Sequence, residues 1–461
     1  MKLKYFLLPG LLALGLSSCG EGFFEQYPSN NITEGNFYKT DDDFNQGVVS
    51  CYAKLKTQMS FHLTEIGYRS DENVLESMAV STQDRYDIDH FAETPSNGIL
   101  SDIWNAWYNG IYRCNDVLDH MAGAKIANYD KYRGECLFMR SWWYFNLYRV
   151  FGVVPVTRTV VAPAAAKLIP RCTEEEMYTL LTEDLAEAAR LLPSTPGAEK
   201  ARVANIAAYT LLAKVYLTFG KPAEAKTALE EAMKNTAYGL ESTTKKAFDV
   251  GNKMNKEIIF ALYYNKTNDN GHGYWYSANT DVMADIRNPT PEFKAIYGDG
   301  DNRLALIGTY TKISSNLFAM TKWYDTYDAT YTTQVGNDFP HLRYADVVLM
   351  YAEALAESGG SLGDALTWLN KTRTRAGLDE LTTDEVKSLA EFRSELAAER
   401  GREFALEGHR WFDLVRLGLA VDYFRGLGYS LDSHNLIFPI PQDQIEIVNN
   451  PSILWQNPGF N

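Results

Sequence analysis

The sequence has no excess of positive charge and lacks the common signatures of catalysis. Its 44 Lys and Arg residues stand against 59 Asp and Glu residues, which gives a net charge of -15. Proteins that bind nucleic acid neutralise phosphates with Lys and Arg, so this balance argues against nucleic acid as a partner. We find no phosphate-binding Gly-Lys loop, no dinucleotide fingerprint and no His-Glu-x-x-His among the seven histidines. We therefore expect neither a cofactor nor a metal site.

Cysteine is scarce as well, with five in 461 residues. The spacing of Cys51, Cys114, Cys136 and Cys172 matches no metal motif, and their pairing cannot be deduced from the sequence. Disulfides are permitted outside the cytoplasm, so the redox state of these four stays open at this point.

The fifth cysteine follows an N-terminal leader. Lys2 and Lys4 precede an apolar run from Tyr5 to Leu16, which is too short to cross a bilayer. Leu16-Ser17-Ser18 then leads into Cys19, as at the end of a signal peptide. We predict a signal peptide over residues 1–18 and a polar tether over 19–32. The alternative is an ordinary secretory signal followed by a disulfide cysteine.

Helical periodicity dominates the chain after the tether. Thr40 and three aspartates predict the capped start of a helix, and a Gly220–Pro222 turn separates two helices with tetratricopeptide-like spacing. The predicted pairs are 41–56 with 104–118, 133–150 with 174–192, two helices within 207–232, and 344–357 with 362–373. The fold class is therefore mainly α, with about four tetratricopeptide-like pairs as a scaffold. An irregular helical bundle is the alternative.

Two segments interrupt this pattern. Residues 71–97 are predicted to form a long loop that carries Phe91 and Asn97. Residues 237–340 form a loop-rich, aromatic-rich insertion, in which rings are interleaved with Gly, Asn, Asp and Thr. Loops on a rigid scaffold are where binding surfaces are expected.

The C-terminal part, residues 385–418, combines apolar residues with a high density of charge. On a helix Arg400 lies one turn from Glu403, and Arg410 one turn from Asp413, so we expect these opposite charges to meet. With Glu407 they predict a structural ion-pair network, because buried charges are tolerated when they are paired. A catalytic carboxylate among the arginines is the alternative, with His409 as the best candidate for a base.

Several segments, in order along the chain, resemble the SusD/RagB family. They are the leader with Cys19, Trp104–Asn115, Gly134–Val156, Glu183–Pro193, Arg202–Leu217, Asp299–Arg303, Leu342–Gly359, Leu369–Leu378 and Glu403–Gly418. The resemblance covers essentially the whole chain. It implies acylation of Cys19, a location on the cell surface at the outer membrane, and a single body over residues 33–461, with its scaffold over 33–236 and 341–378.

The resemblance also implies a function without catalysis. Family members capture oligosaccharides and pass them to a SusC-like TonB-dependent transporter, and the RagB-like branch takes oligopeptides. Carried onto this chain, the ligand-binding loops point to Phe91, Asn97, Tyr274, Trp275, Tyr276, Tyr327 and Tyr331. Flat rings suit a sugar because a pyranose has apolar C–H faces and a polar rim. A glycoside hydrolase and a helical-repeat adaptor for other proteins remain alternatives.

Overall fold

The computed structural model describes residues 37–73, 83–265, 277–279, 289–312, 317–325 and 336–460. The predicted leader and tether lie outside these residues, as do Cys19, Tyr274, Trp275, Tyr276, Tyr327 and Tyr331.

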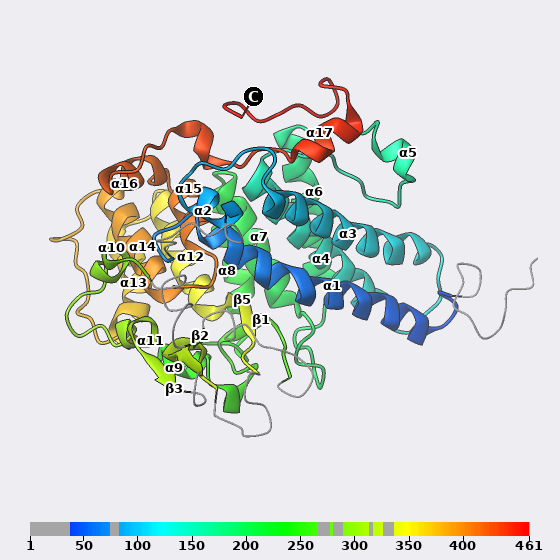
Figure 1. Ribbon diagram of the computed structural model, residues 1–461. Coiled ribbons are helices and arrows are strands. Elements are labelled where there is room, and N and C mark those ends of the chain that lie inside the picture. Colours follow the sequence, from blue (N-terminus) through cyan, green and yellow to red (C-terminus); the bar gives the residue numbers. More distant parts are fainter. Residues whose placement is uncertain are drawn as a thin grey trace, which may run out of the picture.

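Long helices form the body of the described chain, as the periodicity predicts (Figure 1). They are α1 (Asp41–Gly67), α3 (Gly98–His120), α4 (Tyr129–Phe151), α6 (Glu174–Leu191), α7 (Asn205–Thr218), α8 (Pro222–Met233), α12 (Tyr344–Glu357), α13 (Leu362–Arg375) and α14 (Leu389–Glu403). Successive helices pack on one another, from α1 on α3 through α4, α6, α7 and α8 to α12, α13 and α14. The mainly helical fold class and the four predicted pairs are confirmed. None of the described helices is both long and apolar enough to cross a membrane.

Local chemistry explains where these helices begin. Thr40 caps α1 through a bond from the Asp43 amide to its hydroxyl (3.2 Å), and the Asp43 carboxylate accepts from the Thr40 amide in return. Thr173 caps α6 in the same way with Glu176. The hydroxyl of Ser361 caps α13. Gly359 and Gly360, which precede it, therefore belong to the connection between the paired helices α12 and α13. Helix α1 runs well beyond the predicted end at residue 56, because its apolar face continues through Met59, Leu63 and Ile66.

Short helices occupy the segments between the long ones. They are α2 (Gln83–Asp89), α5 (Pro163–Ala166), α9 (Thr244–Ala247), η3 (Val250–Asn252), α10 (Pro291–Ala295), α11 (Leu304–Gly308), η5 (Thr321–Trp323), α15 (Arg410–Arg416), α16 (Ala420–Gly426), η6 (Ser433–Leu436) and α17 (Gln442–Val448). Helix α2 lies within the predicted 71–97 loop. It has only seven residues, too few for a periodic signal in the sequence.

The insertion contains two small sheets. Strands β1 (Ile258–Leu262) and β5 (Phe339–Arg343) are antiparallel neighbours, and Ile258 lies opposite Arg343. Strands β2 (Ser277–Asn279), β4 (Leu317–Met320) and β3 (Tyr310–Lys312) form the other sheet in that order. Pairing of β1 with β5 joins the two ends of the insertion, so the chain leaves the scaffold and returns to it at one place.

All four described cysteines are buried with free thiols. Cys51, Cys114 and Cys136 lie within the core that α1, α3 and α4 share. Burial raises the pKa of the Cys114 and Cys136 thiols, which favours the unreactive protonated form. Cys51 differs, because hydrogen bonds from the Cys114 and Cys136 thiols lower its pKa. The four cysteines are unpaired in the fold and pack as small residues of the interior.

The crossing of α3 over α4 depends on Gly110. A Cβ atom at this position would lie 2.2 Å from Cε2 of the fully buried Trp143. We expect Gly110→Ala to destabilise the fold by about 1–3 kcal/mol, because overpacking outweighs the smaller gain in helix propensity. The midpoint of urea unfolding, followed by circular dichroism, measures the effect.

Gly426→Ala is the matched control, since Gly426 is also helical and an added Cβ meets nothing within 4 Å. This variant should keep the wild-type midpoint or raise it. Equal midpoints for the two variants would contradict the packing argument.

Candidate functional site

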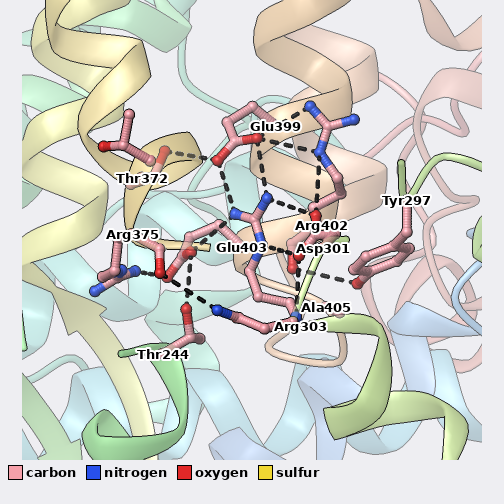
Figure 2. Close-up of polar contacts among 12 residues, drawn as sticks. Thr244, Tyr297, Asp301, Arg303, Thr372, Arg375, Glu399, Arg402, Glu403 and Ala405 are labelled. Carbon is pink, nitrogen blue, oxygen red and sulfur yellow. Dashed lines mark hydrogen bonds and ion pairs between the residues drawn. The ribbon is translucent and has the colours of Figure 1, made fainter. Parts of the chain in front are cut away.

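A buried ion network joins the insertion to the helices around it (Figure 2). We call it the central network. Its cations are Arg303, Lys322, Arg343, Arg375 and Arg402, and its carboxylates are Glu257, Asp301, Glu399, Glu403 and Glu407. Five positive and five negative charges thus balance within the described residues. Such a balance is what makes buried charge tolerable.

Arg343, at the end of β5, contacts three carboxylates of the network. Its Nε and Nη2 donate to the two carboxylate oxygens of Glu407 at 2.8 and 2.9 Å. Its Nη1 donates to Glu257 at 2.6 Å and to Glu403 at 3.0 Å. The pairing of β1 with β5 explains this meeting, because it brings Glu257 beside the end of β5, where the Tyr344 amide donates to the Glu257 carbonyl.

Glu403 lies among three arginines from distant parts of the chain, Arg303, Arg343 and Arg375. Figure 2 shows Arg303 and Arg375 beside it. Arg343 and Arg303 contact its two oxygens at 3.0 and 3.1 Å, and Arg375 pairs with it as well. Burial alone raises the pKa of the Glu403 carboxyl, but the three positive charges outweigh burial and hold the pKa below its usual range. Glu403 is therefore ionised, and both of its carboxylate oxygens contact arginines.

The predicted C-terminal residues are all buried and paired, but not with the partners that helical spacing suggests. Arg400 donates to Asp413 at 2.8 Å instead of pairing with Glu403. Arg410 holds Asp71 through two bonds of 2.9 and 3.1 Å instead of pairing with Asp413. The local pairs predicted from the sequence are wrong, because the fold places other carboxylates beside these arginines: Asp413 and Asp346 beside Arg400, and Asp71 beside Arg410.

Phe91 and Asn97 lie in well-packed positions at the entrance to α3. The Phe91 ring is half-buried against Trp411, Phe424 and Tyr429, with centroids 5.3 to 5.8 Å apart. Asn97 caps α3 by accepting from the Ile99 amide at 3.1 Å, and its own amide group donates to the Asp84 carbonyl at 2.9 Å. The contacts of both side chains are thus made within the protein.

An open groove of about 710 Å³ lies between α1, residues 198–202 and residues 253–263. Tyr263 stands at its edge with 45% of the residue exposed, and the Lys253 ammonium lies 4.5 Å from the centre of its ring. Lys253 is fixed there by the Tyr264 carbonyl at 2.6 Å and by Asp338 at 2.9 Å. The remaining groove side chains include Val49, Tyr52, Lys56, Glu199, Lys200, Arg202 and Met254.

Tyr263 belongs to the aromatic insertion but not to the ligand contacts that the resemblance implies. What distinguishes it is exposure, which depends on the way β1 ends beside α1. The sequence could have indicated the exposure of Tyr263 only if apolar and polar residues alternated along the strand before it. Strand β1 is buried along its whole length, so its residues show no such alternation.

The described polar groups are arranged for structure instead of catalysis. His409 is buried, and burial holds its pKa well below the usual value, so it is neutral at pH 7. Its Nδ1 lies 3.4 Å from Lys214 Nζ. No group of three His, Cys, Asp or Glu side chains in the described part of the chain could hold a metal ion. Fold and site together define a protein with a helical-repeat scaffold and an open groove on its surface.

Comparison with known proteins agrees with that class. The SusD family profile matches residues 298–437, and a profile described as starch-binding associating with outer membrane matches residues 26–217. SusD-like protein P2 of Formosa agariphila is 26% identical over 99% of this chain and 100% of its own length. The chain belongs to the SusD/RagB family.

Solved structures show the same fold. A SusD-like protein of Bacteroides fragilis superposes with a TM-score of 0.79 at 22% identity, over 94% of this chain and all of that one. Surface glycan-binding protein A of Bacteroides thetaiotaomicron, in complex with laminarihexaose, gives a TM-score of 0.74 at 21% identity, over 91% of this chain and 99% of that one.

The central network predicts a large effect for one isosteric change. Glu403→Gln leaves three arginines short of a negative charge, and we expect a loss of about 3–5 kcal/mol in the free energy of unfolding. Because the folded pKa of Glu403 is depressed, its contribution is present above the unfolded value of about 4.3 and is lost as the pH falls toward the folded pKa. The difference between wild type and variant, measured by urea unfolding, should therefore narrow below about pH 4.3.

Glu395→Gln serves as the control on the same helix, because Glu395 makes no ion pair with the described residues. It should change the unfolding midpoint little at any pH. A Glu403→Gln protein as stable as this control would show that the network contributes nothing.

Proposed function

We propose that this protein captures oligosaccharides at the cell surface for import by a SusC-like TonB-dependent transporter. Family membership supports this proposal, as does the likeness to a surface glycan-binding protein that holds laminarihexaose. The geometry that carries it is the exposed Tyr263 ring at the edge of an open groove. A flat ring beside polar groups suits the apolar face and hydroxyl rim of a sugar.

The position of Tyr263 is held firmly enough to act as a stacking platform. It directly follows β1, which is buried and paired with β5. Lys253 occupies a place near the ring and is itself bonded to groups on both sides of the insertion. A platform that is already ordered loses little conformational entropy when ligand binds.

The aromatic residues of the insertion extend this proposal. Tyr274, Trp275, Tyr276, Tyr327 and Tyr331 are proposed ligand contacts. Phe91 and Asn97 are left out of this proposal, because their side chains already make their contacts within the protein. Weak binding is sufficient for capture, because a tethered protein raises the local concentration of ligand at the transporter. Peptide capture, as in the RagB-like branch, is the competing function.

Binding of laminarihexaose and maltohexaose to protein that starts after Cys19 tests the proposal, with isothermal calorimetry as the readout. We expect Tyr263→Ala to weaken the binding of the preferred glycan about tenfold, since a stacked ring is worth roughly 1 kcal/mol beyond the area it buries. Tyr112→Ala is the matched control, because Tyr112 is 50% exposed and does not line the groove.

A Trp275→Ala variant, measured in parallel, distinguishes the two proposed surfaces. Loss of binding in Trp275→Ala with normal binding in Tyr263→Ala would move the site from the groove to the insertion. Binding to peptide pools alone would replace the glycan proposal with the RagB-like one.

The lipid anchor is a separate proposal, in which Cys19 becomes the acylated N-terminus after removal of residues 1–18. Stable membrane attachment requires two or more acyl chains. We expect Cys19→Ser to move the protein from the outer-membrane fraction to the soluble fraction and to abolish labelling by radioactive palmitate. Unchanged fractionation and labelling would rule out anchoring at this residue.

A further inference from the structure

A second buried ion cluster lies where α7, α12, α14 and α15 meet. Its cations are Lys214, Arg400 and Arg416, and its carboxylates are Asp346, Glu353 and Asp413. Lys214 Nζ lies 2.5 Å from Asp346, and Arg400 contacts both Asp346 and Asp413 at 2.8 Å. Arg416 pairs with Glu353 and Asp413. Within the described residues this cluster is balanced, three charges against three.

Arg149 adds a fourth positive charge to this region without a fourth carboxylate. Its guanidinium centre lies 3.9 Å from the ring centre of Phe412 and 4.8 Å from that of Phe145. Among the described residues it forms no ion pair, and its hydrogen bond goes to the Asn146 amide oxygen. Its Nε is buried without a hydrogen-bond partner there. Ring faces attract the cation but offer no lone pairs to its N–H groups.

The carboxylates around Arg149 do not balance its positive charge. Burial lowers the pKa of Arg149 to about 9, and the nearest carboxylates, Asp413 and Asp346, oppose this shift only in part. Both of those carboxylates already pair with other cations. The end of α4 contributes a partial negative charge, because Arg149 lies in its last turn. Arg149 stays protonated at pH 7 with its charge incompletely compensated.

The guanidinium lines a partly enclosed cavity of about 340 Å³. Phe145, Tyr148 and Phe412 provide aromatic walls. The cavity is also lined by Lys214, His409, Asp413 and Arg416. The three charged ones are paired within the second cluster, so Arg149 supplies the charge that is not paired. A cavity of this size is near the lower limit for ligand sites, which suits a single ring better than an oligosaccharide chain. The planar N–H edge of an arginine matches a carboxylate in shape as well as in charge.

We propose that this cavity binds a small ring-shaped carboxylate, with Arg149 as its counter-ion and the aromatic walls against its apolar faces. The site is separate from the groove at Tyr263, because the two share no lining residue. It would give the protein a second ligand class, organic acids, beside the neutral glycans proposed above.

Two sources of such a carboxylate can be distinguished by the probe: a sugar acid, represented by D-glucuronate, and an aromatic acid, represented by benzoate. Calorimetry on protein that starts after Cys19 should show binding of at least one of them, and weaker or no binding of neutral D-glucose. Arg149→Gln and Arg149→Met should each lower the affinity about tenfold or more, as expected for loss of a charge-assisted hydrogen bond. Arg190→Gln, which removes an arginine with a 70% exposed side chain, should keep wild-type affinity.

Stability without ligand provides an independent readout. Removing a partly buried cation that has no carboxylate partner in the described part of the chain should leave the unfolding midpoint of Arg149→Met at or above that of wild type, whereas a purely structural Arg149 would lower it. The proposal is overturned if neither acid binds, if glucose binds as tightly as glucuronate, or if the Arg149 variants bind like wild type. None of these results bears on glycan capture at Tyr263, so the two proposals fail separately.

Discussion

Charge balance in the interior is the constraint on which the rest of this structure depends. The central network places ten ionised side chains where water is excluded, and each unpaired charge there would cost several kcal/mol. Every carboxylate in it therefore has to meet a cation from another part of the chain. Because the cations come from the insertion, β5, α13 and α14, the network can form only when all of these elements are in place. It selects one arrangement of the insertion on the scaffold.

That selection has a consequence for binding. A long insertion can adopt many arrangements on a helical scaffold, and restricting it to one of them costs conformational entropy. Pairing of β1 with β5 fixes its two ends, and Arg303 and Lys322 fix its interior to α14 and to the segment after it. Side chains next to these anchored points, such as Tyr263, are consequently held in fixed positions.

The sequence predicted those parts of the fold that depend on neighbours in the chain. Helical periodicity and the caps at Thr40 and Thr173 depend on residues three or four positions apart, and the predicted helix pairs are present. The partners of Arg400 and Arg410 could not be predicted, because Asp346 and Asp71 are 54 and 339 positions away in sequence. Spacing on a helix gives a list of possible partners, but only the fold decides which carboxylates are close.

The same limit explains why Arg149 is not apparent from the sequence. Arg149 lies in the last turn of the aromatic-rich helix α4, where the helix dipole favours an arginine, so its presence there needs no further explanation from the sequence. Its significance depends on counting charges in space: the central network is balanced, the second cluster is balanced, and Arg149 is left over beside a cavity. Arg171 is buried and also has no ion pair within the described residues, but its guanidinium donates to three backbone carbonyls and the Asn457 amide oxygen. Arg149 differs because its Nε has no hydrogen-bond partner among the described residues and its side chain lines a cavity. Binding of an anion from outside completes the balance that the chain itself leaves open.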